Sequence, residues 1–417
     1  MHLLLIHQNF PGQFRELAPA WLAAGHRITA IGSAADPPQG LRWQGLRYVR
    51  YAFDQEPSSH ERGLAVARLC RELLQEQDHP DLVLSHSGWG EALLLRRALG
   101  PVPWISYPEL WGTPLALGFG FDPDLEALTP KSNTFSGGNL LSELAILQSD
   151  AAVVASRSQM LSFPEPLRRH LRLIPEGVDL NRLTPDPKAR LTLPDHGLEL
   201  MAGQPLVTFI SREMEPLRGL RQLLRAWPSV SHEVPTARLL LVGGDGPGYS
   251  LEPPQGLSHL EDGLANLPQS VDRNRIHHLG RLAYGDMLRL LQCSAAHLAL
   301  SYPYTLSWSV LEAMACGAPL ISNIGSPIAA ELESGLDPQP IELVAFHDTA
   351  GLAGALIQLL QEPRQRHRLG NAGRAWLQNH FDLTQALSAY DAMFQELCQQ
   401  ELTEPGIEES EASAQNP

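Results

Sequence analysis

Short apolar segments alternate along the chain with longer segments in which apolar positions recur at helical spacing. The short runs are typical of buried strands, and the longer segments are typical of amphipathic helices. In the first part of the chain, strands are predicted at residues 3–6, 27–31, 82–85, 102–106, 151–155 and 172–174. The helices predicted between them span residues 14–24, 61–77, 91–99 and 140–149. Strands that alternate with helices in this way form a parallel, doubly wound sheet.

The alternation stops at residues 180–204, where prolines, charges and a glycine predict a linker, and then restarts. The second set of predicted strands covers residues 206–210, 237–242, 275–279, 295–300, 319–322 and 341–344. The predicted helices cover residues 220–231, 286–293, 309–316 and 349–361, and a last helix covers 383–399. The expected fold class is therefore α/β, with two Rossmann-like doubly wound domains that face a cleft.

The domain boundaries follow from the same pattern. The first domain is expected at residues 1–178 and the second at 179–382, with the helix at 383–399 packing back on the first domain. The acidic, polar end of the chain, 400–417, is predicted to be disordered. A long loop region at 115–138, rich in glycine, proline and serine, is expected to be mobile over the cleft.

Composition narrows the class of protein. At 417 residues the chain has room for two or three domains. Its net charge of −15 argues against a nucleic-acid binder, which needs a basic face. The four cysteines, Cys70, Cys293, Cys316 and Cys398, lack zinc-ligand spacing and indicate reduced thiols in a cytoplasmic protein. No apolar run approaches the roughly 20 residues of a membrane-spanning helix, and the start of the chain is expected to be a strand and not a signal peptide.

The segment most informative about function is 301–322, SYPYTLSWSVLEAMACGAPLIS. A polar, aromatic loop leads from a strand into a helix that is expected to begin at Ser309. The free N–H groups and dipole of a helix N-terminus attract phosphate, so Ser309, Val310 and Leu311 are expected to face one. Glu312, in the first turn, would repel phosphate and is expected to face hydroxyl groups such as those of a ribose. The segment predicts a pocket for a sugar nucleotide.

Three stretches resemble a known family: HQNFPGQFRELAPAWLAAGHRI (7–28), ISREMEPLRGLRQLLRA (210–226) and segment 301–322. In order and spacing they are similar to the family 4 glycosyltransferases, which have the glycosyltransferase-B fold. HQNFPGQF resembles the N-terminal domain of one subgroup. The resemblance implies an acceptor-side first domain and a second domain that binds the nucleotide sugar.

The resemblance also implies a reaction. It implies a retaining hexosyltransferase that moves a hexose from a nucleoside diphosphate sugar to a saccharide or lipid-linked acceptor, in cell-surface polysaccharide or glycoconjugate biosynthesis. No metal and no cofactor beyond the donor substrate are expected. The alternatives are a nucleotide-sugar epimerase on the same fold and a catalytically impaired protein that only binds sugar nucleotides. The sequence does not identify the base, the sugar, the acceptor, the linkage or the oligomeric state.

Arg212 and Arg218 are the expected catalytic cations. Arg212 follows a strand and Arg218 precedes a helix, so both should lie at the carboxyl ends of the sheet strands, where ligands bind. Two guanidinium groups there suit a diphosphate, which gains charge as the glycosidic bond breaks. The alternative is a pair of surface arginines paired with Glu213 and Glu215.

Glu312 and Tyr304, both in segment 301–322, each have a feature that bears on their expected roles. Ser309 and Glu312 also fit a capping box, in which the glutamate side chain bonds to the backbone N–H at the helix start. This purely structural role is the alternative to ribose binding for Glu312. Tyr304 stands where the family usually has a glutamate that supports the donor sugar, and Ser307 interrupts the usual Phe-Gly-Leu. A tyrosine supplies no anion at neutral pH, so the donor sugar or its orientation is expected to differ. Tyr304 and Ser307 are nevertheless expected to line the donor site.

The remaining candidates rest mainly on the resemblance. His86, at the end of a strand, matches a family histidine that contacts the donor sugar, and Gly12 is expected to bring backbone N–H groups close to a sugar or phosphate. Leu282 lies where the family binds the nucleobase. Asp122-Pro-Asp124 formally resembles a metal-binding motif but is expected to be a turn, with no metal. Arginines at 96–97, 168–169 and 172 leave open a peripheral contact with the inner membrane face.

Overall fold

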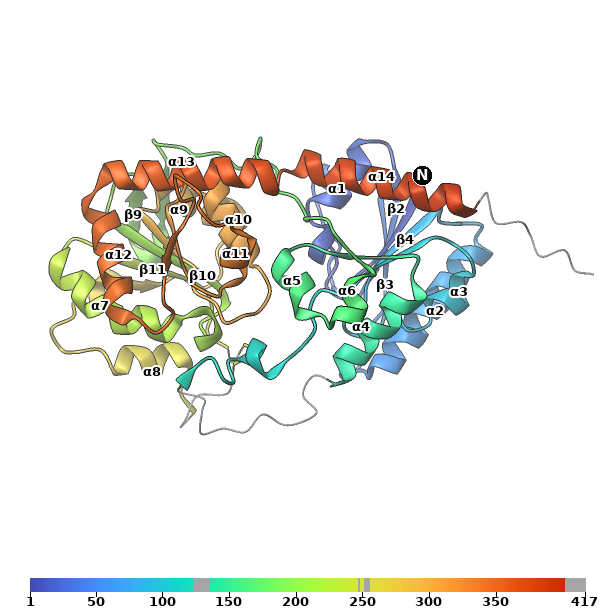
Figure 1. Ribbon diagram of the computed structural model, residues 1–417, viewed down its shortest axis with the longest axis horizontal. Helices are drawn as coiled ribbons and strands as arrows, with labels where there is room; N and C mark the ends of the chain where they lie inside the picture. Colours follow the sequence, from blue (N-terminus) through green and yellow to red (C-terminus); the bar gives the residue numbers. More distant parts are fainter. Residues whose placement is uncertain (124–135, 247, 251–255, 402–417) are drawn as a thin grey trace, which may run out of the picture. The chain divides into compact units, whose positions relative to one another are not determined.

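The computed structural model describes residues 1–123, 136–246, 248–250 and 256–401. The predicted disordered tail lies outside these residues from 402 onward, as does the part of the predicted mobile loop at 124–135. Within these described ranges, the strands form two parallel sheets and one antiparallel hairpin (Figure 1). The predicted fold class is confirmed, because each sheet is doubly wound by helices.

The first sheet has seven parallel strands in the order β3-β2-β1-β4-β5-β6-β7. The order reverses between β1 and β4, so the chain winds outward in both directions from that point. β3 was not predicted, because its sequence LRYVR contains only half-buried and exposed residues and has no continuous apolar run. The strands are β1 (His2–Ile6), β2 (Arg27–Gly32), β3 (Leu46–Arg50), β4 (Leu82–His86), β5 (Trp104–Tyr107), β6 (Ala151–Val154) and β7 (Leu171–Leu173).

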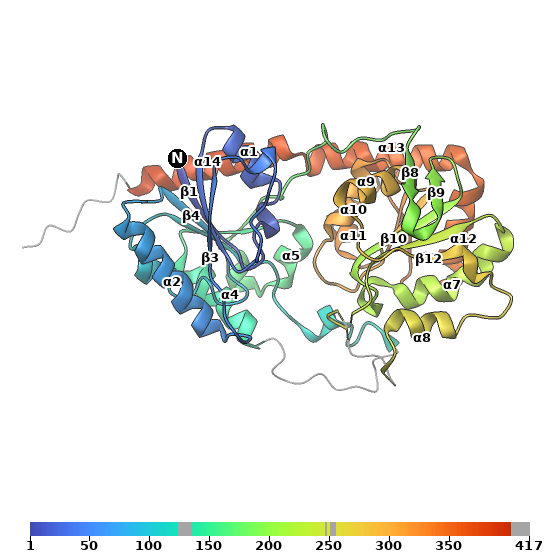
Figure 2. The ribbon, with the colours of Figure 1, turned by 180° about the vertical axis from the view of Figure 1, so that it is seen from behind.

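Helices cover both faces of this sheet. α2, α3 and α4 share one apolar cluster with β1, β4 and β5, and α2 runs along that face (Figure 2). On α1, the Trp21 ring lies 5.5 Å from the rings of Tyr390 and Phe394 on α14, so the last helix packs on the first one. The helices are α1 (Leu17–Ala23), α2 (Ser59–Gln75), α3 (Leu95–Leu99), α4 (Ser136–Gln148), α5 (Arg157–Ser162), α6 (Glu165–Arg168) and α14 (Leu383–Glu401).

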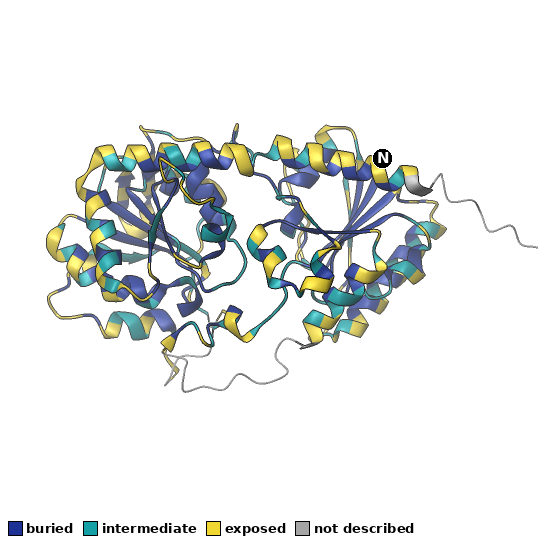
Figure 3. Cartoon of the chain, viewed as in Figure 1, coloured by how far each residue is buried: buried dark blue, intermediate teal, exposed yellow. Residues whose placement is uncertain are grey.

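The second sheet has six parallel strands in the order β12-β11-β10-β13-β14-β15, which reverses between β10 and β13. Successive strand residues point to opposite faces: Val207 and Phe209 enter one core cluster and Leu206 enters another. Figure 3 shows the strands buried and the outer faces of the helices exposed. The strands are β10 (Leu206–Glu213), β11 (Arg238–Gly244), β12 (Ile276–His278), β13 (Ala296–Leu298), β14 (Leu320–Asn323) and β15 (Glu342–Val344).

The helices of the second sheet form two layers. α7, α8 and α12 contribute to one core cluster, and α9, α10 and α13 contribute to the clusters of the opposite face. α13 was not predicted, because charged residues and two glycines interrupt its apolar positions. The helices are α7 (Leu220–Glu233), α8 (His259–Ala265), α9 (Tyr284–Cys293), α10 (Trp308–Ala315), α11 (Pro327–Glu331), α12 (Thr349–Gln361) and α13 (Pro363–His380).

The predicted linker at 180–204 is wrong for its second half. β8 (Arg190–Leu193) and β9 (Leu198–Met201) form an antiparallel hairpin there. Alternate residues of both strands are buried, and they pack on the second sheet in one cluster with β10 and β11. The proline and charges that indicated a linker lie at the hairpin turn, where Gly197 adopts a positive φ.

The first part of the predicted mobile loop is also ordered. Phe119 and Phe121 pack against the core of the second sheet. The Tyr302 hydroxyl donates to the buried carboxylate of Asp122, and His347 Nε2 donates to the Phe121 carbonyl at 2.8 Å. Asp122 therefore anchors this segment, whereas Asp124, the second acid of the formal metal motif, lies outside the described residues.

Contacts divide the chain into two compact units. The first contains Met1–Tyr107, Leu144–Ala152 and the described chain from Leu387 onward, and the second contains Pro108–Glu143 and Val153–Ala386. Sheet pairing gives a different division, since β7 pairs in the first sheet but belongs to the second unit. The boundary predicted near residue 178 stays a prediction. None of the helices in the described part of the chain is long and apolar enough to cross a membrane.

Replacing Phe394 with alanine tests the docking of α14 on α1. The ring is almost fully buried against Trp21, so its loss should lower the free energy of unfolding of the first unit by about 3–5 kcal/mol. Urea denaturation followed by tryptophan fluorescence measures the change. The exposed neighbour Gln395, replaced with alanine, is the matched control. Equal stability of the two variants would show that α14 is not docked there.

Candidate functional site

The residues predicted to bind the diphosphate gather where the strand order of the second sheet reverses. Ligands of open α/β sheets bind at this point, beyond the carboxyl ends of the strands, because the chain leaves the two strands in opposite directions there. Arg212 lies at the carboxyl end of β10, and Arg218 ends the short turn Pro216–Arg218 that follows. The loop 301–307 leaves β13 beside them and leads into α10.

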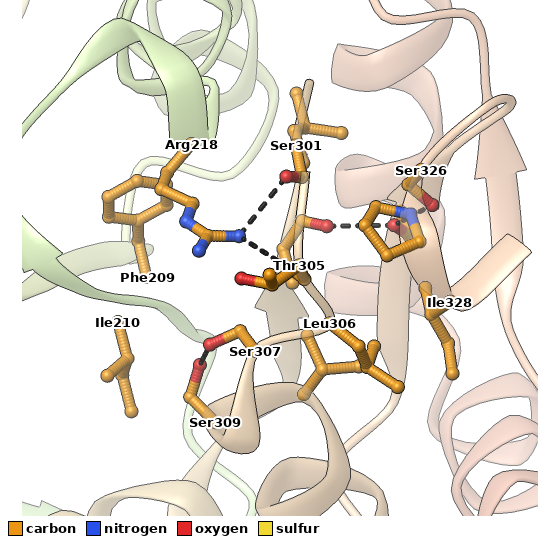
Figure 4. A pocket seen from close by; sticks show the side chains of 15 residues that line it. Phe209, Ile210, Arg218, Ser301, Thr305, Leu306, Ser307, Ser309, Ser326 and Ile328 are labelled. Carbon is orange, nitrogen blue, oxygen red and sulfur yellow. Dashed lines mark hydrogen bonds between the residues drawn. The ribbon is translucent and has the colours of Figure 1, made fainter. Parts of the chain in front are cut away.

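A pocket at this point is lined mainly by hydroxyl and apolar groups (Figure 4). Among the fifteen residues that line it, Arg218 is the only charged one. Hydroxyl donors around a single cation suit the oxygen atoms of a phosphate. The hydroxyl-bearing residues are Ser301, Thr305, Ser307, Ser309, Ser322 and Ser326.

The Arg218 side chain is fixed within this pocket. Its Nη1 donates to the Ser301 hydroxyl at 3.1 Å and to the Thr305 carbonyl at 3.3 Å, as the dashed lines in Figure 4 show. The guanidinium carbon lies 5.7 Å from the centre of the Tyr304 ring. Burial lowers the pKa of Arg218 from its ordinary value, since the charged form loses water.

Arg212 is exposed at the same strand end. Its Nη1 donates to the Tyr249 hydroxyl at 2.8 Å, and its guanidinium lies over the Tyr249 ring at 5.4 Å. Among the described residues, no carboxylate lies within ion-pair distance of Arg212 or Arg218. Neither arginine thus forms the direct ion pair of the alternative prediction, although Glu215 attracts Arg218 and Arg212 attracts Glu213 at longer range.

The two glutamates hold a neighbouring loop instead. Glu213 accepts the Gly246 N–H at 2.8 Å and pairs with Arg281, and these contacts lower the pKa of Glu213, the backbone N–H most of all. Glu215, which is buried, accepts the N–H groups of Tyr249 and Ser250 at 2.8 and 2.9 Å. Both carboxylates are used to shape the loop after β11.

The N-terminus of α10 faces the pocket, but not through a capping box. The helix begins at Trp308, so Ser307 is the N-cap and Glu312 lies too far along the helix to reach back. Ser309 Oγ instead bonds to Ser307 Oγ at 2.9 Å, and the Val310 N–H donates to the Ser307 carbonyl at 3.1 Å. The capping-box alternative for Glu312 is wrong.

The other candidates of the second unit have identifiable surroundings. Glu312 is buried and accepts from the Tyr284 hydroxyl at 2.9 Å. Tyr304 is half-buried, and burial raises the pKa of its phenol above the ordinary value, so the ring is neutral. Leu311 is buried in the core cluster to which α10 contributes. Leu282 is half-buried and packs against the other cluster, which contains residues of β8, β9, β10 and β11.

The first sheet brings two histidines together at its own reversal point. His7 directly follows β1 and His86 ends β4, and their ring centres lie 4.9 Å apart. His86 stacks on Trp89 with a centre distance of 4.2 Å, and the Gly88 N–H donates to its Nδ1 at 3.2 Å. In neutral His86 the proton is therefore on Nε2. His7 and Trp89 were not singled out from the sequence, although His7 directly follows a strand that the apolar pattern predicts.

His7 fixes the loop that contains Gly12. Its Nδ1 accepts the Asn9 N–H at 2.9 Å, and its Nε2 donates to Gln13 Oε1 at 2.5 Å. Gly12 adopts a φ of +46°, and a Cβ atom there would lie 2.2 Å from His7 Nε2. Glycine is needed at this position because the loop closes directly over the His7 ring.

Two family models match the chain in succession. The model described as "Glycosyl transferase family 4 group" matches residues 24–183, and the model described as "Glycosyl transferases group 1" matches residues 204–362. The two models match the first and the second half of the chain in the same order as the motifs that resemble the family.

Two curated relatives illustrate the range of sequence similarity. A GDP-mannose-dependent monoacylated alpha-(1-6)-phosphatidylinositol monomannoside mannosyltransferase from Corynebacterium glutamicum is 31% identical over 213 residues, which cover 48% of this chain and 50% of that protein. A D-inositol 3-phosphate glycosyltransferase from Actinosynnema mirum is 26% identical over 375 residues, which cover 86% of this chain and 80% of that protein. The first match thus spans about half the length of that relative.

Solved structures show the same fold. A sucrose-phosphate synthase from Thermosynechococcus elongatus superposes with a TM-score of 0.69 at 19% identity, over 96% of this chain and 100% of that one. The Anabaena protein HepE in complex with UDP and glucose superposes with a TM-score of 0.65 at 16% identity, over 95% of this chain and 100% of that one. The predicted glycosyltransferase-B fold is confirmed.

The buried His7 predicts how stability depends on pH. Burial, and then the charge of His86, hold the pKa of His7 well below its usual value. Below pH of about 6.5 the unfolded chain therefore binds a proton that the folded chain does not, so stability is complete above this pH and falls below it. The slope contributed by His7 approaches about 1.4 kcal/mol per pH unit.

Denaturation of the wild type and of His7→Asn between pH 8 and 5 tests this dependence. The asparagine variant, although less stable at pH 8, should lose less stability on acidification. Parallel curves for the two proteins would contradict the assignment.

Proposed function

Because the chain belongs to the family 4 (group 1) glycosyltransferases, we propose that it transfers a hexose from a nucleoside diphosphate sugar to a saccharide or lipid-linked acceptor. The observation that carries the proposal is the pair Arg212 and Arg218. Both lie at the reversal point of the second sheet, and neither has a carboxylate partner among the described residues. Two guanidinium groups that no described carboxylate contacts directly fit an anionic ligand at this place, and Glu215 attracts Arg218 only at longer range.

The chemistry follows from the leaving group. When the glycosidic bond breaks, the diphosphate takes the bonding electrons and its negative charge increases. Guanidinium groups and the N-terminus of α10 stabilise this charge more strongly in the transition state than in the bound donor. The hydroxyls of Ser307 and Ser309, at the start of α10, share one hydrogen bond and so leave one hydrogen to donate to a remaining phosphate oxygen. Those of Ser301 and Ser322 donate instead to the Tyr302 and Ala299 carbonyls. Arg212 and Arg218 thereby supply the positive charge that would otherwise come from a metal ion, and the proposed reaction is independent of metal.

Retention of configuration is part of the proposal. A retaining enzyme with a covalent intermediate needs a carboxylate nucleophile close to the sugar. None of the described residues that line the pocket carries a carboxylate. We therefore propose attack by the acceptor on the face from which the diphosphate departs. Glu312 is proposed to bind the ribose, Leu282 the base, and His86 the donor sugar, each on the resemblance of the motifs.

The names of the relatives guide the choice of donors. The Corynebacterium relative is GDP-mannose-dependent, and the Anabaena structure contains UDP and glucose. Tyr304, which stands where the family usually has a glutamate, favours one competing function: a protein that binds the donor without turning it over. Release of the nucleoside diphosphate separates the two functions.

A donor panel that includes GDP-mannose and UDP-glucose, incubated with candidate saccharide and lipid-linked acceptors, tests the proposal. The wild type should release a nucleoside diphosphate. Arg212→Gln and Arg218→Gln should each lower the rate by about 10²–10³-fold, the usual cost of removing a transition-state donor. The exposed Arg190 of β8, replaced with glutamine, should have the wild-type rate. Donor binding without release would favour the binding protein, and full activity of both arginine variants would remove them from the site.

Glu312→Gln tests the proposed ribose contact. Glutamine can still accept from Tyr284, so the melting temperature should change little. The Kd for UDP or GDP should rise by about 10-fold, because a charge-assisted hydrogen bond is replaced by a neutral one. Binding of inorganic pyrophosphate, which has no ribose, should be unchanged. Equal weakening for both ligands, or a large loss of stability with unchanged binding, would contradict the ribose role.

A further inference from the structure

Each of the two arginines lies against a tyrosine ring, and no described carboxylate contacts either of them. The Arg212 guanidinium lies 5.4 Å from the Tyr249 ring centre and bonds to its hydroxyl at 2.8 Å. The Arg218 guanidinium lies 5.7 Å from the Tyr304 ring centre. The two rings are themselves in contact, with their centres 5.8 Å apart. Arg212, Tyr249, Tyr304 and Arg218 thus form one continuous cluster, called here the Arg–Tyr cluster.

The backbone around Tyr249 is built to bring its ring into this cluster. Glu215 accepts the N–H groups of Tyr249 and Ser250, and Ser250 Oγ accepts the Leu217 N–H at 3.2 Å. Gly248 has a φ of +65°, and a Cβ atom there would lie 2.5 Å from Glu215 Oε2. The loop is therefore tied to the turn between Arg212 and Arg218.

Charge explains why tyrosine suits this task. A carboxylate would hold a guanidinium in place but would also cancel its charge and compete with an anionic ligand. A neutral ring holds the cation through its π-face and leaves the charge available. A fixed guanidinium also loses less rotamer freedom when a ligand binds.

Tyr249 has little role in the core. Its side chain is 48% exposed, so few apolar contacts depend on it. Tyr304 differs, because it is half-buried and packs against the core cluster of the second sheet. Its ring therefore also contributes to packing. A substitution that keeps the ring, such as Tyr304→Phe, tests the hydroxyl alone.

We propose that Tyr249 and Tyr304 are positioning residues that hold Arg212 and Arg218 in place for the diphosphate of the donor without neutralising them. The proposal rests on the proposed function, because it assigns a role toward the same ligand. Neither tyrosine takes part in bond making. Tyr249 acts through its ring and hydroxyl, and Tyr304 acts through its ring.

Calorimetric titration with inorganic pyrophosphate tests this role without knowledge of the base or the sugar. Tyr249→Leu should raise the Kd by about 10-fold and Tyr249→Phe by about 3-fold, since phenylalanine keeps the stack and loses only the hydrogen bond. Tyr304→Phe should bind like the wild type. Tyr304→Leu should raise the Kd by about 10-fold, because leucine removes the ring that lies against the Arg218 guanidinium.

Controls separate positioning from folding. Tyr48→Phe removes a tyrosine hydroxyl bond of similar length, 3.0 Å to the Ala34 carbonyl in the first unit, and should leave the Kd unchanged. The melting temperature of Tyr249→Phe should equal that of the wild type. In the transfer assay, Tyr249→Phe should lower kcat/KM for the donor, a change that a purely structural tyrosine would not produce at unchanged melting temperature.

The outcomes distinguish this proposal from the one on which it rests. Loss of pyrophosphate binding in Arg212→Gln together with wild-type binding in Tyr249→Leu would overturn the positioning role and leave the proposed function intact. Tighter binding by Tyr249→Phe would also overturn it, since the hydroxyl would then be a competitor for Arg212. Absence of pyrophosphate binding by the wild type would overturn both.

Discussion

Two guanidinium groups that no described carboxylate contacts lie together at the reversal point of the second sheet. The protein as a whole is acidic, with a net charge of −15, and the carboxylates of Glu213 and Glu215 are bonded to backbone N–H groups and, for Glu213, to Arg281. These carboxylates keep their charge and Glu215 attracts Arg218 at longer range, but neither contacts a guanidinium of the pair, so the donors of Arg212 and Arg218 stay open to a ligand. An anionic diphosphate is the ligand that this arrangement favours, and the tyrosine rings preserve the charge while they fix its position.

The fold supplies that place for physical reasons. A parallel doubly wound sheet has one point where neighbouring connections leave in opposite directions, and side chains at the strand ends converge there. The second sheet puts Arg212 and the loop 301–307 at its reversal, and the first sheet puts His7 and His86 at the corresponding point. Both groups of residues thus result from the same topological rule, applied once in each sheet.

The sequence predicted most of the sheets and part of the site. Continuous apolar runs located the central strands because both faces of a parallel sheet are buried. The β8–β9 hairpin was missed because its residues alternate between buried and exposed, and β3 was missed because none of its residues is fully buried. Arg212 and Arg218 were predicted from their places beside a strand and a helix. Tyr249 was not predicted to be part of the site. Its contact with Arg212 depends on a loop that is bonded to Glu215, and the sequence near Tyr249 has no pattern that indicates this long-range contact. The sequence also did not predict that α10 begins one residue earlier than expected, at Trp308, which places Glu312 too far from the N-cap for a capping box.

A crystal structure of the protein with bound UDP or GDP tests the central claim most directly. The account predicts the diphosphate within hydrogen-bond distance of both Arg212 and Arg218, beside the first turn of α10, with the Tyr249 and Tyr304 rings still stacked on the arginines. A diphosphate bound at another place, or crystals with no nucleotide at saturating concentration, would contradict it.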